Sequence, residues 1–337
     1  MQNNRKEIQA TIAKIEKLRN SKVLTFFTSD RNPRELFATA IATDVIPYYY
    51  DCLKSLGKCK KITLVLNSSG GILDAPWPIV NLIREYTQYL EVLVPSKAFS
   101  TATLICLGAN KIIMLPYSQL SPIDPTGRFP QKDKTTINIS VEDVFGFVDL
   151  VKSHIGASDQ TTLTEILKVL SGEISPTILG NVSRTFHRTR QLAKRLLELH
   201  LKNVNNKDQI NKIIENLTEK LYSHSHFINR KEAKDIIGFG NIIEYANAEL
   251  EENTNRILKI YENEFKENER FDIDKILETE DKVEFIARNG VIGSTKTNYY
   301  FERKFLVVKD TTKTPPIQLN KIELGWIKEG EENDIKK

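Results

Sequence analysis

The chain has 337 residues, of which 40% are hydrophobic and 27% are charged, and its formal net charge is +4. This composition supplies a sizeable core and argues against a membrane protein, because no apolar run approaches the roughly 20 residues of a spanning helix. The length exceeds that of most single domains, so we expect one main domain with extensions.

The N-terminal segment predicts a charged helix over residues 6–19 with Ile8, Ile12 and Ile15 on one stripe. This helix is expected to pack on the body of the protein or on a second subunit. The segment lacks the apolar stretch of a secretory signal. A strand over residues 23–28 and a helix over 44–56 follow.

The central stretch, residues 61–125, organises the rest of the chain. An apolar strand breaks at Asn-Ser-Ser-Gly-Gly, and Ser100 opens a helix of small and apolar residues. Two adjacent glycines allow positive φ and a close approach of the backbone to a ligand. The spacing predicts strands at 62–66, 90–94 and 112–115 and helices at 75–86 and 101–108.

Right-handed crossovers would bring the loops after neighbouring parallel strands into one crevice, so Gly70, Gly71 and Ser100 are expected to meet. A hydroxyl at a helix start lies where free N–H groups favour negative charge, and glycine N–H groups facing it would form an oxyanion hole. A serine in this position also fits an ordinary helix cap. The residues alone leave both interpretations open.

Residues 126–140 are polar and turn-rich, which indicates a substrate-side or subunit-contact loop, and a helix is expected to resume over 141–156. Lys152 falls at the margin of the apolar stripe of this helix. One interpretation is that its aliphatic chain packs on the stripe and its ammonium group reaches water. The other is that the ammonium group is desolvated, and desolvation would lower the pKa of Lys152 toward that of a usable base.

Residues 161–222 predict a long helical region with a basic cluster at 184–195, interpreted as a solvated helix face or a contact with acidic residues of another subunit rather than as a nucleic-acid site. His224 and His226 follow, and this His-x-His pair has no evident third ligand for a metal. The three cysteines, Cys52, Cys59 and Cys106, lack metal-ligand spacing and indicate reduced thiols in a cytoplasmic protein.

The C-terminal part predicts a helix over 241–270 and then β-hairpin strands from residue 280, with turns at Asn-Gly 289–290 and Gly-Ser 293–294. One more strand is expected after residue 315, and the last residues are expected to be disordered. The predicted division is an N-terminal helix (1–22), a main domain (23–240) and a C-terminal helix with a β appendage (241–337).

The motifs NSSGG, AFSTATLICLGANKIIMLP and LSPIDP, in this order and spacing, resemble the Clp protease/crotonase superfold. Within it, the chain is most similar to the serine dehydrogenase proteinase family of signal-peptide-peptidase-like serine peptidases, over roughly residues 36–240. The resemblance implies an α/β fold with a repeated ββα core, a helical segment and a small C-terminal β-containing appendage.

The resemblance also implies roles for individual residues. Ser100 would be the nucleophile, and Lys152, about fifty residues further on, would be the base of a Ser-Lys dyad. His224 fits the register of a family histidine and is the alternative base, or else a structural histidine. Backbone N–H groups of Gly71 and Thr101 would hold the oxyanion, with Gly70 shaping the turn. Relatives carry Gly or Ala after the serine, and Thr101 would narrow this pocket.

The leading hypothesis is therefore a cytoplasmic serine endopeptidase that forms an acyl-enzyme and requires no metal or cofactor. Its expected partners are a peptide or protein substrate and further copies of the chain, with no membrane and no nucleic acid. One alternative is a catalytically inactive Clp-like scaffold or binding module. Another is an acyl-CoA hydratase or hydrolase of the crotonase type, against which the serine at the helix start argues.

Overall fold

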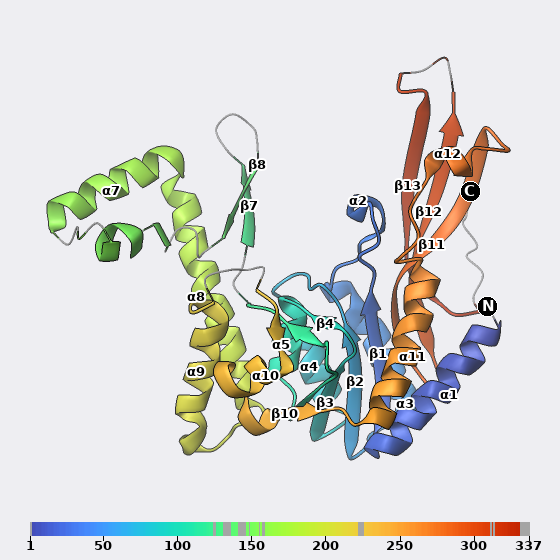
Figure 1. The fold of residues 1–337 in the computed structure, drawn as a ribbon, viewed down its shortest axis with the longest axis horizontal. Coiled ribbons are helices and arrows are strands. Elements are labelled where there is room, and N and C mark those ends of the chain that lie inside the picture. The colour runs from blue at the N-terminus through green and yellow to red at the C-terminus, as the bar shows by residue number, and fades with distance from the viewer. Residues whose placement is uncertain are drawn as a thin grey trace.

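The computed structural model describes residues 2–123, 126–130, 136–140, 146–147, 149–154, 156, 159–221, 226–310, 312 and 314–330. The fold is mixed α/β and is built on an eight-stranded sheet of order β10-β5-β3-β2-β1-β11-β12-β13 (Figure 1). The five strands from β10 to β1 run parallel, and β11, β12 and β13 continue the sheet antiparallel. The expected α/β fold is confirmed.

The parallel strands are β1 (Lys22–Thr28), β2 (Lys61–Asn67), β3 (Tyr89–Val94), β5 (Lys111–Met114) and β10 (Ile243–Tyr245). Three of them, β2, β3 and β5, come from the predicted central stretch. These three strands are almost wholly buried, which explains their near-continuous apolar sequence.

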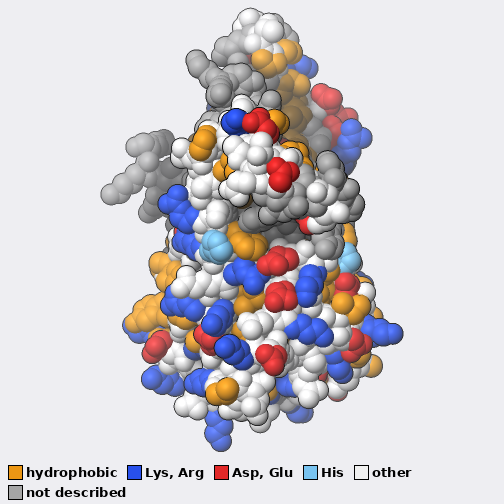
Figure 2. Space-filling view, turned by 90° about the vertical axis from the view of Figure 1, so that its left-hand side faces the viewer, with side chains coloured by type: hydrophobic (Ala, Val, Ile, Leu, Met, Phe, Trp, Pro, Cys, Tyr) orange, Lys and Arg blue, Asp and Glu red, His pale blue; other side chains and the backbone are white. Residues whose placement is uncertain are grey.

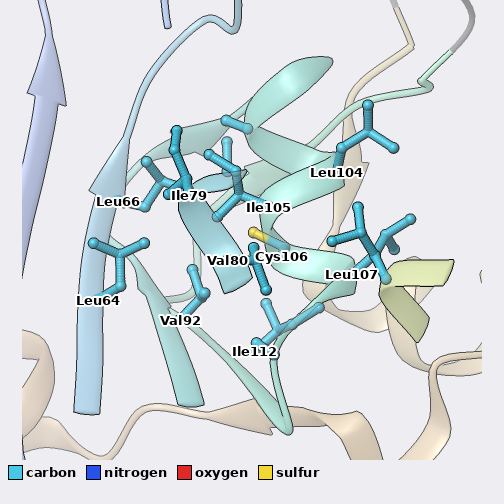
Figure 3. Close-up of a cluster of buried hydrophobic side chains, with 14 of the residues drawn as sticks. Leu64, Leu66, Ile79, Val80, Val92, Leu104, Ile105, Cys106, Leu107 and Ile112 are labelled. Atoms are coloured by element: carbon cyan, nitrogen blue, oxygen red, sulfur yellow. The ribbon is translucent and has the colours of Figure 1, made fainter. Parts of the chain in front are cut away.

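One face of the sheet is covered by α3 (Ile46–Leu56), α4 (Pro76–Arg84) and α5 (Thr101–Leu107). Outside this layer, α8 (Pro176–Glu198) packs on α4 and α5, and α9 (Lys207–Thr218) packs on α8. The apolar side chains of α5 point into this core with those of β2, β3 and α4 (Figure 3). Cys106 lies among them and is fully buried. The helix that follows Ser100 is therefore fixed by burial along its whole length.

The other face is covered by α1 (Gln2–Arg19) and α11 (Ala248–Phe265). The isoleucine stripe of α1 is fully buried there. Of the two placements expected for this helix, the body of the protein and a second subunit, the structure shows the first. Arg19 at the end of α1 is paired with Glu91 of β3 at 2.7 Å and with Glu244 of β10 at 2.6 Å.

The remaining elements are short or lie outside these layers. α7 (Gln160–Glu173) projects from the body (Figure 1). Small strands β4 (Lys97–Ala98), β6 (Gln119–Leu120) and β9 (Ile228–Asn229) form a second sheet, and β7 (Thr126–Pro130) pairs with β8 (Thr136–Ser140). The short helical pieces are α2 (Arg34–Phe37), η1 (Thr43–Val45), η2 (Leu150–His154), η3 (Val204–Asn206), α10 (Arg230–Glu232), η4 (Ala233–Ile237), η5 (Gly240–Ile242) and α12 (Ile273–Ile276).

Three sequence expectations are corrected by the structure. The segment expected as a loop at 126–140 contains the β7–β8 hairpin. The helix expected over 241–270 begins only at Ala248, because Asn247 caps it and the preceding residues form edge strand β10. Asn289 and Gly290 do not form a turn, since they lie inside β11 (Lys282–Ser294) where its pairing with β12 (Asn298–Lys309) shifts register.

The strand expected after residue 315 is confirmed as β13 (Ile317–Lys328). The division into 1–22, 23–240 and 241–337 stays a prediction, and the last residues, 331–337, lie outside the described residues. Among the helices that the structure describes, none combines the length and apolar composition needed to cross a lipid bilayer.

The basic cluster on α8 has partners within the same chain. Arg188 pairs with Asp74 and Arg190 with Glu219, and the Arg195 guanidinium lies 3.8 Å from the centre of the Trp77 ring. Figure 2 shows that acidic side chains are interspersed with basic ones on this face of the molecule. The surface is therefore a mixed-charge helix face.

We predict acid sensitivity from His200, which follows α8 and whose Nε2 lies 2.9 Å from the Leu107 carbonyl oxygen. Burial lowers the pKa of His200 to about 4, from an ordinary value of 6.5. Between these values the unfolded chain binds more protons at this site, so the free energy of unfolding should fall by up to about 3 kcal/mol as the pH drops from 6.5 to 4.

Urea unfolding at several pH values checks this expectation. His200→Gln should flatten the slope in that pH window relative to wild type, whereas His187→Gln, at an exposed position of α8, should not. Equal slopes in the wild type and His200→Gln would contradict the assignment.

Candidate active site

The glycine turn after β2 is held between two backbone segments. The Ile41 N–H donates to the Gly70 carbonyl and the Ile72 N–H donates to the Ile41 carbonyl, both at 2.8 Å. A Cβ on Gly71 would lie 2.0 Å from the Ile41 oxygen, and one on Gly70, where φ is +104°, would lie 2.7 Å from the Phe99 oxygen. Neither position accepts a side chain without movement of the backbone.

Ser100 lies between β4 and α5 with φ +50° and ψ −113°, a conformation rarely adopted by residues other than glycine. A serine on such a strained strand-to-helix turn is the arrangement of a nucleophile elbow. Its side chain makes no capping hydrogen bond to α5, so the ordinary capping role is not observed. Ser100 is half-buried, and no group in the described part of the chain hydrogen-bonds to its hydroxyl.

The backbone of Ser100 is fixed by a residue to which the sequence analysis gave no role. The Ser100 N–H donates to Ser121 Oγ at 2.7 Å, and the Ser121 N–H donates to Thr103 Oγ1 at 3.2 Å. Thr103 Oγ1 in turn donates to the Ala98 carbonyl at 2.7 Å. The signal was present in the LSPIDP motif, since Ser121 directly follows β6, the partner of β4.

The predicted oxyanion donors face the same turn. Thr101 Oγ1 donates to the Gly71 carbonyl at 2.8 Å, and the position of a Cβ on Gly70 would be 3.3 Å from the Thr101 nitrogen. Within the described residues, neither the Gly71 N–H nor the Thr101 N–H has a hydrogen-bond acceptor. The structure thus brings Gly70, Gly71, Ser100 and Thr101 together.

The two predicted bases are not placed by the structure. Lys152 lies in η2, but its side chain is outside the description, and His224 is itself outside the described residues. His226 is described, and its Nε2 lies 2.6 Å from Glu232 Oε1. The next residue, Phe227, stacks on Phe99 with ring centres 5.2 Å apart. Because Phe99 directly precedes Ser100, this contact places His226 and Phe227 near the candidate site.

An ion-paired cluster adjoins the glycine turn and was not foreseen. The Asp30 carboxylate accepts hydrogen bonds from Ser69 and from Lys97, the latter at 2.5 Å, and pairs with Arg34 at 2.7 Å. Asp30 follows β1, so its position at the same carboxyl edge of the sheet was available from strand order. For the part of the chain described, no three His, Cys, Asp or Glu side chains are grouped to hold a metal ion.

We predict that Gly71→Ala lowers the free energy of unfolding by about 2 kcal/mol, because the added Cβ overpacks the turn against Ile41. The matched control is Gly180→Ala in α8, where a Cβ meets nothing within 4 Å and helix propensity favours alanine by about 1 kcal/mol. Chemical denaturation of both variants checks this, and a Gly71→Ala protein as stable as wild type would contradict the geometry.

Comparison with known proteins adds a family match. Residues 35–174 match the Clp protease family. An uncharacterised protein of Methanocaldococcus jannaschii is 35% identical over 79 residues, which is 23% of this chain and 28% of that protein. A second protein of that organism is 33% identical over 70 residues, 20% of this chain and 24% of that one. The chain therefore matches about a quarter of the length of these relatives.

Similar solved structures include a mutant of ClpP1 from Listeria monocytogenes, with 16% identity, a TM-score of 0.37 and coverage of 70% of this chain and 99% of that one. Another is a mutant of the 1510-N membrane-bound stomatin-specific protease in complex with a substrate peptide, with 16% identity, a TM-score of 0.36 and coverage of 62% and 71%. The residues that match the Clp protease family include the glycine turn, Ser100 and Lys152.

Proposed function

We propose that the protein is a serine peptidase of the serine dehydrogenase proteinase type, in which Ser100 is the nucleophile. The observation that carries this proposal is the strained backbone of Ser100, with a hydroxyl free of hydrogen bonds in the described part of the chain, next to the Gly70–Gly71 turn. Strain of this kind persists only where surrounding contacts enforce it, and it concentrates at functional sites. The Clp protease family match over residues 35–174 supports the same conclusion.

In the proposed reaction, Ser100 Oγ attacks the scissile carbonyl while Lys152 Nζ takes the hydroxyl proton. The Gly71 and Thr101 N–H groups hold the oxyanion of the tetrahedral intermediate. Collapse of this intermediate expels the amine, which receives the proton from Lys152, and leaves an acyl-enzyme on Ser100. Water activated by the same lysine then releases the acid and restores the hydroxyl.

An extended peptide is the substrate class that this arrangement suits. A chain lying beside the glycine turn can pair through its own backbone, which requires no particular side chain at most positions. We further propose a homo-oligomer in the cytoplasm, on the basis of the family resemblance and the three free cysteines.

A fluorophosphonate probe tests the nucleophile. Wild type should be labelled covalently, Ser100→Ala should lose all labelling, and Ser55→Ala, which removes a hydroxyl in α3, should keep it. Intact-protein mass spectrometry reads the adduct. A wild-type protein that stays unlabelled would favour the inactive scaffold, and a CoA-dependent shift in melting temperature without labelling would favour the acyl-CoA chemistry.

Three variants identify the base. Lys152→Ala should slow phosphonylation by about 10²–10⁴-fold, the usual contribution of a general base. Lys152→Arg should be equally slow, because a guanidinium keeps its proton, while His224→Ala should react at the wild-type rate. The reverse pattern would make His224 the base, and wild-type rates in all three would contradict both assignments.

A further inference from the structure

The hydroxyl of Thr101 connects the start of α5, which follows Ser100, to the Gly70–Gly71 turn. Thr101 is the first residue of α5 and is 2% exposed. Its Oγ1 donates to the Gly71 carbonyl at 2.8 Å, across 30 residues of sequence. Glycine or alanine at position 101 would leave that carbonyl without this donor.

The direction of the Gly71 N–H follows from the pairing of its neighbours. Gly71 forms a parallel bridge with Ile41, in which the Gly70 carbonyl and the Ile72 N–H are the groups that face Ile41. In an extended chain, successive residues direct their N–H and C=O groups to opposite edges. The N–H and C=O of Gly71 therefore both point away from Ile41, and the carbonyl meets Thr101, so the N–H faces that side too.

We propose that the Thr101 side chain is a positioning residue that holds the Gly71 N–H as an oxyanion donor. This inference rests on the proposed function. Glycine backbones are conformationally free, so a donor on the Gly70–Gly71 turn needs external restraint to keep its direction. Ile41 restrains the turn from one side, and the Thr101 hydroxyl restrains it from the other.

The same residue would then serve the oxyanion twice, through its own backbone N–H and through its hold on Gly71. The β-branched side chain is well suited to this because its χ1 angle is restricted. The side chain is buried against the turn, and its hydroxyl is bonded to the Gly71 carbonyl. The Gly71 carbonyl and the Gly71 N–H lie on the two sides of one Cα, so loss of the hydroxyl would free rotation at Gly71 and change the direction of its N–H. Oxyanion donors act only within a narrow distance range, so this change should reduce reactivity without affecting binding.

The test uses a fluorophosphonate probe, whose phosphonyl oxygen occupies the oxyanion position. Thr101→Val keeps the shape of the side chain and removes the hydroxyl. We expect the maximal rate of phosphonylation to fall about tenfold, as for loss of one buried hydrogen bond, and the apparent dissociation constant of the probe to stay unchanged. Thr101→Ser should restore most of the rate, because it returns the hydroxyl.

The matched control is Thr254→Val in α11. Thr254 is fully buried and its Oγ1 donates to the Leu250 carbonyl at 2.6 Å, so this variant also loses a buried hydroxyl bonded to a backbone carbonyl. Its phosphonylation rate should equal that of wild type even if its melting temperature falls. Melting temperatures of all variants separate loss of fold from loss of reactivity.

Several results would overturn the inference. A Thr101→Val protein that reacts like wild type, an equal loss of rate in Thr101→Val and Thr254→Val, or a failure of Thr101→Ser to restore the rate would each do so. A loss that appears only in the dissociation constant would also contradict a role in oxyanion positioning. These outcomes differ from failure of the proposed function, in which wild type itself is not labelled and both proposals fall.

Discussion

The candidate site depends on the close approach of three backbone segments, around Ile41, Gly70–Gly71 and Phe99–Thr101. The glycine turn lies between the Ile41 and Phe99–Thr101 segments. The space is so small that a Cβ on either glycine would overlap a carbonyl oxygen of the neighbouring segment. This steric limit, rather than any single strong bond, fixes where the free N–H groups lie relative to the Ser100 hydroxyl. Close packing of this kind transmits strain, which is how a non-glycine residue is kept at φ +50°.

The surrounding layers supply the rigidity that the site requires. Ser100 is anchored on one side by Ser121, which directly follows the small sheet, and on the other by α5, whose residues are all buried. The last residue of α5, Leu107, is hydrogen-bonded through its carbonyl to His200, which follows α8. The two ends of α5 are therefore held by different parts of the chain. A rigid scaffold of this type can hold donors within the few tenths of an ångström that oxyanion stabilisation demands.

Many of the strands and helices that position the candidate site were predictable from local sequence. The strands at 62–66, 90–94 and 112–115 and the helix after Ser100 were found because buried parallel strands and apolar helices leave uninterrupted hydrophobic runs. Strand order then placed Gly70, Gly71 and Ser100 at one edge. The bulge at Asn289–Gly290 was misjudged because the dipeptide suits both a hairpin turn and an irregular strand.

The sequence could indicate where Ser121 and Asp30 lie, but it could not show which distant groups their side chains contact. Ser121, Asp30 and the Thr101 hydroxyl act through contacts with residues distant in the chain, and their residue types are common in loops of every kind. The Asn247 cap, by contrast, was visible as a residue type but was outweighed by the acidic periodic pattern around it. Pattern reasoning thus located the backbone of the site and missed the side chains that restrain it.

The position of β1 has a consequence for dissection of the molecule. The segment that matches the Clp protease family begins after β1, yet β1 lies in the middle of the sheet, and α1 and α11 cover the face that includes Val65, Leu93 and Ile113. Excision of residues 35–174 would leave β2 as an open edge and one whole sheet face bare to water. The hydrophobic interior of the matched segment is thus completed by the parts of the chain on either side of it.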